Sequence, residues 1–557
     1  MMERVWLTSY PPGVPADIDA GRYGSLVDLM EESFRQHAAS VAYSFMGQDI
    51  SYAQTDAHIL AFAAYLQSLG LARGDRVAVM MPNVPQYPVA VAGILRAGLV
   101  LVNVNPLYTA RELEHQLKDS GARAIIIIEN FASTLEKCLA ATPVKHVVLC
   151  AMGDQLGTIK GALVNYVVRN VKKIVPPFSL PTAVRFNQAL ARGAKSAFTK
   201  PVIRADDVAV LQYTGGTTGI SKGAVLLHRN VLANVLQCEA WYAPAMAQVP
   251  ADQQPTSVCA LPLYHIFAFT VGMMLTLRTG GKLVLIPNPR DIAGVLKELS
   301  KHAVHVFPAV NTLFNALASH PDFHSVDWSE LKVTIGGGAA VQSAVAKLWF
   351  DKTGCPICEG YGLSETSPSA TCNPVTSVEY TGSIGLPLPS TYLRLLNDEG
   401  SEAAPGEPGE IAIKGPQVMA GYWQRPDETA KSMTADGYFK TGDIGVVDAR
   451  GFFKIVDRKK DMILVSGFNV FPTELEDVVG QMPGVMECAC VGMADAKSGE
   501  AVKLVIVRKD PALTESDVRA WCKENLTGYK QPRVVEFRDA LPKTPVGKVL
   551  RRELRDK

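Results

Sequence analysis

Short runs of aliphatic residues alternate with helix-like segments in the part of the chain that precedes residue 350. The runs are RVAVMM (76–81), LVLVNV (99–104) and AIIIIE (124–129), and the charged segment ARELEHQLKDSG (110–121) lies between two of them. Parallel strands that are buried on both faces have continuous Val/Ile/Leu runs and are joined by helices. The alternation therefore predicts an α/β fold.

The chain has 557 residues, which is more than one hydrophobic core usually organises. Near Tyr380 the pattern changes to short strands with Gly and Pro turns, as in GEPGEIAIKGPQVMAGYW (406–423), which predicts a smaller β unit. The final stretch mixes strands, such as CACVGM (488–493), with helices and fits a separate α+β domain.

Composition excludes some functions and compartments. The net charge of +1 gives no reason to expect a nucleic-acid partner. The ten cysteines are scattered, as expected for reduced thiols. Cys355 and Cys358 have the CxxC spacing of a zinc site, but no second pair lies nearby, so we interpret them as thiols that pack in the core. Residues 1–19 lack the apolar centre of a signal peptide, and no apolar run is long enough to span a bilayer. We expect a cytoplasmic protein, either free or held at a membrane surface.

The segment GTIKGALVNYVVRNVKKIVPPF (157–178) is basic and amphipathic. It carries four cations and no acid, and Leu163, Tyr166, Val171 and Ile174 recur near helical spacing. Such a helix can lie on the anionic cytoplasmic face of a membrane. The alternative is a surface helix that packs on its own domain.

The stretch YTGGTTGISKGAVLLHRN (213–230) follows an apolar run and is rich in glycine and hydroxyl groups. It matches neither a Walker loop nor a Rossmann GxGxxG. Its glycines can still turn backbone N–H groups inward, and its hydroxyls and lysine can contact phosphate oxygens. These residues are Thr214, Gly215, Gly216, Thr217, Thr218, Gly219, Ser221 and Lys222. We interpret the stretch as a phosphate loop, the alternative being a mobile surface loop.

Four further motifs accompany this loop in a fixed order. They are EGYGLSETSP (359–368), YFKTGDIG (438–445), IVDRKKDMILVSGFNVFPTELE (455–476) and LPKTPVGKVLRREL (541–554). Together with the loop they resemble the adenylate-forming superfamily, which includes acyl-CoA synthetases, luciferases and the adenylation domains of peptide synthetases. The opening RVWLTSYPPGVPADID and the stretch LPLYHIFA make the chain most similar to bacterial long-chain fatty-acid–CoA ligases.

The resemblance implies a two-step reaction. A carboxylate attacks the α-phosphate of ATP and expels pyrophosphate, and the thiol of coenzyme A then attacks the acyl-adenylate. ATP, Mg²⁺ and coenzyme A are the implied cofactors. The implied architecture is a large N-terminal domain (1–456) of two α/β subdomains with a small β-barrel unit, followed by a small mobile α+β domain (457–557) hinged at Asp457.

Site residues carry over from the motifs position by position. The implied ATP contacts are Tyr213, Thr214, Gly215, Gly216, Thr217, Thr218, Gly219, Lys222, Gly337, Gly338, Gly360, Tyr361, Gly362, Ser364, Asp443, Arg458 and Lys548. The implied catalytic set is Lys548, His265, Glu365 and Thr214, with Glu365 as the magnesium ligand. The implied coenzyme A contacts are Gly467, Phe468, Asn469, Tyr529 and Lys530. Ser364 stands where the family more often has Thr. Thr473 and Glu476 have the spacing of a capping box.

The substrate acid is expected to be apolar. No Asp or Glu occurs between Leu261 and Arg290, so the ammonium group of an amino acid would find no partner there. We therefore expect a ligase for medium- to long-chain fatty acids. The alternatives are a ligase for another acyl or aryl acid, and an inactive fatty-acid carrier at the membrane surface. The resemblance also implies a homodimer, to which no single residue points.

Overall fold

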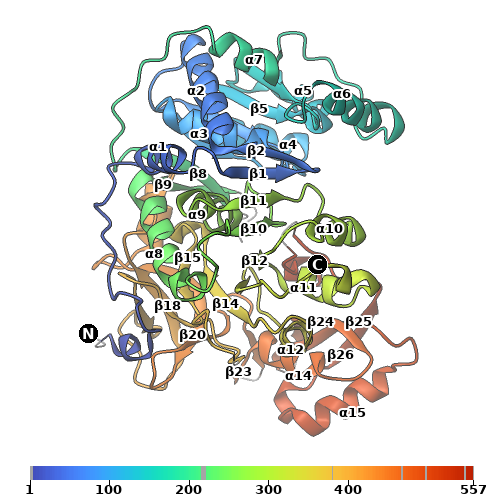
Figure 1. Ribbon diagram of the computed structural model, residues 1–557. Coiled ribbons are helices and arrows are strands. Elements are labelled where there is room, and N and C mark those ends of the chain that lie inside the picture. The colour runs from blue at the N-terminus through green and yellow to red at the C-terminus, as the bar shows by residue number, and fades with distance from the viewer. Residues whose placement is uncertain are drawn as a thin grey trace.

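The computed structural model describes residues 4–555 except 215–220, 379, 466–467, 496–497 and 545–546. Two large mixed sheets form the bulk of the molecule, one above the other with helices between and around them (Figure 1). The α/β class predicted from the aliphatic runs is confirmed, because all three runs form neighbouring strands of one sheet.

The first large sheet has the strand order β19-β9-β8-β4-β3-β5-β6-β7. Strands β3 to β8 are parallel, whereas β9 and β19 are antiparallel to their neighbours. The bounds are β3 Arg76–Met80, β4 Val100–Asn103, β5 Ala124–Ile128, β6 His146–Cys150, β7 Val184–Arg185, β8 Val208–Thr214, β9 Lys222–Leu227 and β19 Gly421–Tyr422. The antiparallel turn from β8 to β9 contains the predicted phosphate loop.

The second large sheet has the order β16-β15-β14-β13-β12-β10-β11-β1-β2. Its central strands are parallel, and antiparallel strands close both edges. The bounds are β1 Val41–Phe45, β2 Gln48–Ser51, β10 Thr256–Cys259, β11 Lys282–Leu285, β12 Val306–Ala309, β13 Val333–Gly336, β14 Ile357–Gly362, β15 Ser369–Cys372 and β16 Leu386–Pro387. Residues 336–338 are three consecutive glycines, two of them implied ATP contacts, and we call them the glycine wall. They begin at the carboxyl end of β13, the end at which ligands bind in parallel sheets.

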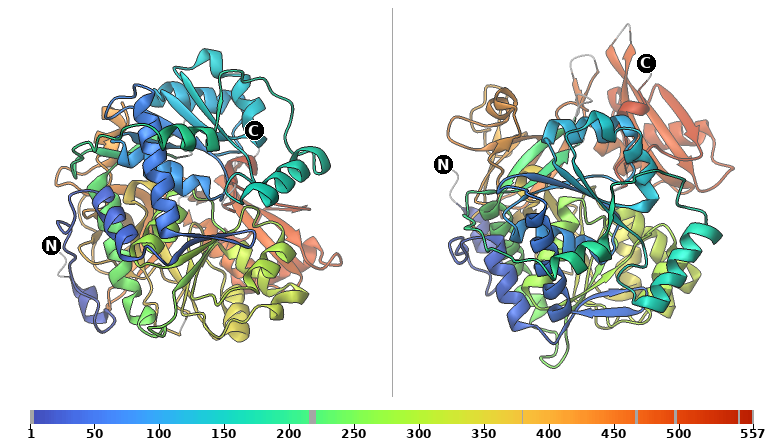
Figure 2. Two further views of the ribbon diagram at one scale, coloured as in Figure 1. Left: turned by 45° about the horizontal axis from the view of Figure 1, so that its top comes forward. Right: turned by 90° about the horizontal axis from the view of Figure 1, so that it is seen from above.

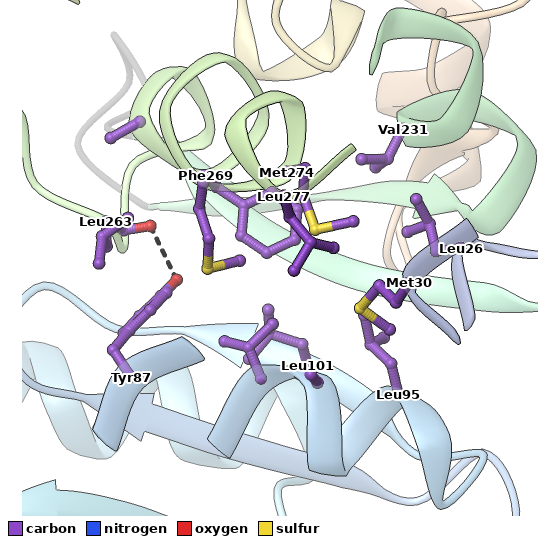
Figure 3. Close-up of a cluster of buried hydrophobic side chains, with 14 of the residues drawn as sticks. Leu26, Met30, Tyr87, Leu95, Leu101, Val231, Leu263, Phe269, Met274 and Leu277 are labelled. Carbon is purple, nitrogen blue, oxygen red and sulfur yellow. Dashed lines mark hydrogen bonds between the residues drawn. The ribbon is translucent and has the colours of Figure 1, made fainter. Parts of the chain in front are cut away.

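Apolar helices fill the space between the two sheets. Figure 3 shows side chains of α1 (Leu26–Gln36) and α3 (Gln86–Arg96) meeting side chains from three later segments. These segments are α8 (His228–Met246), the π-helical segment η5 (Ala268–Met274) and α9 (Leu275–Arg278). The Tyr87 hydroxyl crosses this layer and donates to the carbonyl oxygen of Leu263 (2.7 Å). This bond fixes the loop that carries His265 two residues later.

The bounds of further helices are α2 Tyr52–Ser68, α4 Ala110–Ser120, α5 Ala132–Glu136, α6 Thr158–Tyr166, α7 Phe186–Gly193, α10 Ile292–Leu299, α11 Asn311–Ala318, α12 Ser343–Thr353 and α13 Pro426–Ser432. Of these, α2 and α7 pack on the same face of the first sheet as α3, and α4 and α5 cover its other face. Helices α10, α11 and α12 cover the outer face of the second sheet. Helices α2 and α7 approach closely, because a Cβ on Gly193 would lie 1.8 Å from the backbone oxygen of Ala61.

Two smaller sheets follow the second large sheet along the chain. The predicted β-barrel unit takes the form of a four-stranded antiparallel sheet of β17 (Tyr392–Leu396), β18 (Gly409–Lys414), β20 (Phe439–Val447) and β21 (Phe453–Arg458). The C-terminal α+β part has its own sheet and its own core, and it lies at one side of the molecule (Figure 2). Its elements are β22 Ile463–Val465, β23 Phe468–Val470, α14 Pro472–Gly480, β24 Val485–Asp495, β25 Gly499–Arg508, α15 Glu515–Asn525 and β26 Val534–Arg538.

The basic segment 157–178 forms a helix at the periphery of the molecule (Figures 1 and 2). Helix α6 continues into the π-helical segment η4 (Val167–Val171), so the helix ends before the two prolines. Glu129, which is buried, accepts hydrogen bonds from Arg169 (2.8 and 2.9 Å) and Arg185 (2.8 Å) and thereby anchors it. Within the part of the chain that the structure describes, no helix is long and apolar enough to cross a membrane.

Candidate active site

The predicted phosphate loop joins β8 to β9, and most of it lies outside the described residues. That portion contains five predicted contacts, which are Gly215, Gly216, Thr217, Thr218 and Gly219. At its two ends, Thr214 and Lys222 are Cα partners in the antiparallel pair. The Tyr213 hydroxyl donates to Asp119 Oδ2 on α4 (2.7 Å), so its phenol group is occupied within the protein.

Close packing explains two of the predicted nucleotide glycines. A Cβ on Gly337 would lie 2.9 Å from Cε1 of Phe267, and one on Gly362 would lie 1.7 Å from a backbone carbonyl oxygen. Gly338 has a φ of +78°, which favours glycine. A Cβ on Gly360 would make only ordinary contacts, the nearest at 3.6 Å. Gly362 is therefore required by the fold itself, whereas a side chain at Gly337 would have to displace the Phe267 ring.

Residues from two different motifs contact the carboxylate of Asp443, which belongs to a third. Asp443 and Arg458 are opposite each other in the β20–β21 pair, and Arg458 Nε lies 3.2 Å from Asp443 Oδ1. The Tyr361 hydroxyl, from β14, donates to Asp443 Oδ2 (2.6 Å). Asp443 is buried, and burial together with this carboxylate raises the pKa of Tyr361 well above its usual value. Three of the implied ATP contacts, from three different motifs, are thus joined by one hydrogen bond and one ion pair.

Glu365 is a buried carboxylate in the short helix η7 (Ser364–Thr366). Burial raises its pKa, and the Tyr422 hydroxyl, which donates to Glu365 Oε1 (2.7 Å), acts in the opposite direction. A carboxylate oxygen is a ligand that Mg²⁺ accepts. The described residues contain no group of three or more His, Cys, Asp or Glu side chains able to hold a metal. Glu365 is thus the residue that would hold a magnesium ion in this part of the chain.

Lys548 and His265 lie within electrostatic range of each other, although one comes from the end of the chain and the other follows β10. Burial, together with the charges of Arg458, Lys460 and Arg551, lowers the pKa of Lys548 to about 7. Burial, and then the charge of Lys548, lowers the pKa of His265 to about 4. Both side chains are thus held in a region that disfavours their charged forms.

The loop that carries Lys548 packs against the large N-terminal part. A Cβ on Gly547 would lie 3.0 Å from Thr312 Oγ1 on α11 and 3.7 Å from Val310 Cγ2. The Lys548 N–H donates to Thr544 Oγ1 (3.0 Å) and shapes the turn. The predicted lysine motif therefore reaches the vicinity of the glycine wall, because Val310 also contacts Gly338.

Of the five predicted coenzyme A contacts, the structure describes the side chains of Phe468, Tyr529 and Lys530. Gly467 lies outside the described residues, and for Asn469 only the backbone, in β23, is described. The exposed Phe468 stacks on Tyr529 with ring centroids 4.9 Å apart. Lys530 contacts both carboxylate oxygens of Glu474 (2.7 Å each), so its charge is balanced within the protein.

Asp457, the predicted hinge residue, supports the start of helix α14. Its Oδ2 accepts the Thr473 N–H (2.9 Å), and its Oδ1 accepts the Arg458 N–H (2.6 Å). The predicted capping box is wrong: α14 begins at Pro472 after Phe471, without a side-chain cap from Thr473. Glu476 instead accepts the Cys490 N–H (2.7 Å) and pairs with an arginine of the C-terminal segment.

Sequence reasoning missed several polar residues behind the site. Asp119, Tyr422 and Glu428 contact Tyr213, Glu365 and Lys222 respectively, and Arg425 contacts Asp119. The stretch GYWQRPDETA (421–430) resembles ordinary strand and helix sequence, so its partners become visible only in three dimensions.

An apolar cavity lies between helix α8, the segment formed by η5 and α9, and the second large sheet. Its volume is about 290 Å³, and Tyr242, Met246, Val271, Leu275 and Val306 are among its walls. It lies at the amino ends of β10, β11 and β12, whereas the glycine wall lies at the carboxyl ends of the same sheet. Val306 begins β12, and Val310, an extended residue, follows directly after the strand, about 13 Å farther on. Strand β12 thus leads from the cavity toward the glycine wall.

Comparisons with known proteins match the chain to one family along most of its length. The family model described as AMP-binding enzyme matches residues 30–423, and the model for the C-terminal domain of that enzyme matches residues 474–548. The chain is 54% identical over 556 residues to a long-chain-fatty-acid–CoA ligase of Escherichia coli O157:H7, covering all of this chain and 98% of that protein. It is 36% identical to the enzyme of that name from Bacillus subtilis, covering 99% and 98%.

Solved structures give the same picture. ATP-bound MatB from Rhodopseudomonas palustris superposes with a TM-score of 0.79 at 29% identity, covering 95% of this chain and 98% of that one. The anthranilate CoA ligase AuaEII, in complex with anthranoyl-AMP, has a TM-score of 0.84 at 24% identity, covering 96% and 98%, and shows likeness of fold.

The bonds of Asp457 lead to a testable prediction about stability. Asp457→Ala removes the acceptor for the Thr473 N–H and should weaken the first turn of α14 by about 1 kcal/mol. Amide hydrogen exchange at 473–476 should then accelerate. Asp457→Asn, which keeps an acceptor oxygen, is the control. Equal protection of these amides in Asp457→Ala and the unmodified protein would contradict the cap.

Proposed function

Because the chain belongs to the AMP-binding enzyme family, we propose that it is a fatty-acid–CoA ligase that uses ATP to activate medium- to long-chain acids through an acyl-adenylate. AMP and pyrophosphate are the other products. The observation that carries the proposal is the convergence of Lys548 and His265 near the Asp443–Arg458 pair, in a chain that matches curated long-chain-fatty-acid–CoA ligases over its whole length. The role in the cell would be fatty-acid uptake and degradation.

In the first step, the chain positions ATP for in-line attack at the α-phosphorus. Thr214, Lys222 and the loop between them would hold the β- and γ-phosphates, which leave as pyrophosphate. Asp443 would accept hydrogen bonds from the ribose hydroxyls, in exchange for the Tyr361 hydroxyl. A magnesium ion held through Glu365 would neutralise charge that develops on the phosphate oxygens.

Lys548 would bridge the α-phosphate and the attacking carboxylate. With a pKa of about 7 in the nucleotide-free site, the lysine is incompletely charged at neutral pH. Two bound anions would raise that pKa and complete the charge, so the cation appears where negative charge accumulates. His265 would remain neutral, and because its Nδ1 accepts the Phe267 N–H (3.3 Å), its Nε2–H is free to donate to the substrate carboxylate.

The second step requires a different arrangement of the two domains. We place the division at 456/457 and the hinge at Asp457, with residues 457–557 as a mobile lid. Rotation would withdraw Lys548 and bring Gly467, Phe468 and Asn469 toward the adenylate. The exposed Phe468–Tyr529 stack offers an aromatic surface for coenzyme A, and the pairing of Lys530 with Glu474 makes this lysine the weaker candidate.

The acyl chain would run along β12 toward the apolar cavity. Val306, Val310 and Val271 supply aliphatic surface along this path. Glu239, the acid in the cavity wall, is paired with Arg278 (3.1 Å), so the cavity offers no unpaired carboxylate to a substrate ammonium group. This supports a fatty acid over an amino acid.

Lys548→Ala should separate the two half-reactions. Adenylate formation, measured as fatty-acid-dependent ATP–pyrophosphate exchange, should slow by about a hundredfold or more. This is the usual effect of removing one group that stabilises charge in a transition state. Thioester formation from supplied acyl-adenylate and coenzyme A should be retained. Equal loss of both activities would contradict the domain rotation.

The activity profile across acids of rising chain length tests the substrate class. We expect kcat/KM to rise with the length of the acyl chain. Val271→Phe, which fills the cavity, should lower kcat/KM for long-chain acids by about tenfold and leave kcat/KM for medium-chain acids unchanged. Met273→Phe, on the same segment but outside the cavity wall, is the control. Activity on an aryl or amino acid, with none on any fatty acid, would overturn the proposed substrate.

The two alternatives make different predictions in the same assay. A ligase for another acid would release pyrophosphate only with that acid. An inactive carrier would release none, although it retains Lys548, Glu365 and Asp443.

We further propose that the helix at 158–171 contacts the cytoplasmic face of the membrane. Ile159, Leu163, Tyr166 and Val171 are 60–86% exposed, and Ile174 just beyond is 49% exposed. Lysines flank this apolar surface and suit anionic lipid headgroups. A dimer formed through the large domain is a separate proposal, which sedimentation velocity would test.

Vesicles that contain anionic lipid test the membrane contact. The double change Ile159→Gln with Leu163→Gln should reduce cosedimentation several-fold, since each apolar side chain inserted contributes roughly 1.5–3 kcal/mol at most. Leu107→Gln, at an exposed leucine on another surface, is the control. Equal binding by all three proteins would contradict the assignment.

A further inference from the structure

The lysine that flanks the phosphate loop already has a carboxylate partner within the chain. Lys222 Nζ forms an ion pair with Glu428 Oε2, which comes from helix α13. Both side chains are partly exposed, at 22% and 35%. Glu428 also contacts Lys431 on its own helix through Oε1 (3.2 Å). In the nucleotide-free protein, the charge proposed to hold the triphosphate is therefore balanced by Glu428.

The backbone holds the two partners in a fixed relation. Strand β19, just before α13, pairs with β9, which Lys222 begins. The Trp423 N–H donates to the Gly223 carbonyl oxygen (2.7 Å), and the Tyr422 N–H donates to Thr429 Oγ1 on α13 (2.9 Å). The sheet thus holds the strand that begins with Lys222 next to the segment that leads into α13, which carries Glu428.

Asp119 on α4 contacts both the end of β8 and the segment that leads into α13. Asp119 accepts a hydrogen bond from the Tyr213 hydroxyl at Oδ2 (2.7 Å) and from Arg425 at Oδ1 (2.6 Å). Its backbone oxygen accepts the Trp423 indole N–H (3.1 Å). The residue before the phosphate loop and the residue before α13 therefore share a single anchor.

Tyr422 connects this ion pair to the proposed magnesium carboxylate. Lys222 Nζ lies 5.6 Å from the centre of the Tyr422 ring, and the hydroxyl of the same ring donates to Glu365 Oε1 (2.7 Å). The Tyr422 ring thus links the Lys222–Glu428 ion pair to Glu365, the proposed magnesium ligand. A triphosphate bound there would meet both the lysine and its carboxylate partner.

We propose that Glu428 is a positioning residue that competes with polyphosphate for Lys222. Because it neutralises the lysine and repels the nucleotide anion, it weakens ATP binding. After adenylation it pairs again with Lys222 and accelerates the release of pyrophosphate. The inference rests on the proposed function, because it takes the anion at Lys222 to be ATP and then pyrophosphate.

The test removes the charge of Glu428 and preserves its shape. Glu428→Gln should lower the dissociation constant for ATP, measured by calorimetry, by about fivefold. The inhibition constant for added pyrophosphate should fall by a similar factor, and pyrophosphate release in single-turnover experiments should slow. Asp427→Asn is the matched control: Asp427 is the exposed neighbour on α13 and has no ion pair to any described residue.

A double-mutant cycle separates competition for Lys222 from a general effect of charge. In the Lys222→Met background, Glu428→Gln should no longer change ATP binding. The proposal is overturned if Glu428→Gln binds ATP and pyrophosphate as the unmodified protein does, if Asp427→Asn has the same effect, or if the effect persists without Lys222. A failure of the proposed function would look different, since the unmodified protein would then release no pyrophosphate with any fatty acid.

Discussion

The pairing register of β20 and β21 determines where the charges of the site lie. It places Asp443 opposite Arg458 and Ile444 opposite Asp457. Successive side chains of a strand point to opposite faces, so Arg458 turns toward Tyr361 and Asp443, whereas Asp457 turns toward α14. A slip of one residue would exchange the two faces and separate the ribose carboxylate from its arginine. The same short strand pair thus joins the nucleotide residues to the start of the C-terminal domain.

Around this pair, the protein holds charged groups in surroundings that disfavour their charge. The pKa of Lys548 is lowered to about 7 and that of His265 to about 4, while burial raises the pKa of Glu365. Substrates would supply the missing partners: phosphate and carboxylate for the lysine, and a divalent cation for the glutamate. Because the groups are positioned in advance, little reorganisation is needed as charge moves during reaction. The Lys222–Glu428 pair is the counterpart at the phosphate end, where the protein supplies the balancing charge itself.

The sequence predicted three strands of the first large sheet, because continuous Val/Ile/Leu runs such as 124–129 are stable when buried on both faces of a sheet. It also predicted Tyr361, Asp443 and Arg458, which the fold joins through a hydrogen bond and an ion pair, although they come from three separate motifs. The capping box at Thr473 failed because spacing alone cannot show that Pro472 already begins the helix and that Asp457, from another strand, accepts the N–H. Asp119 and Glu428 were missed for a related reason: an acid on a helix surface acquires a role only through a partner that tertiary structure brings to it.

The central claim is that a fatty carboxylate attacks the α-phosphorus of ATP and that the loop after β8 holds the pyrophosphate that leaves. The most direct test uses a long-chain fatty acid labelled with ¹⁸O in its carboxylate, with ATP, Mg²⁺ and coenzyme A. After one turnover, mass spectrometry should find one ¹⁸O atom in the phosphate of AMP and none in pyrophosphate. Label in orthophosphate or pyrophosphate, with unlabelled AMP, would contradict the account, because the carboxylate would then have attacked a different phosphorus.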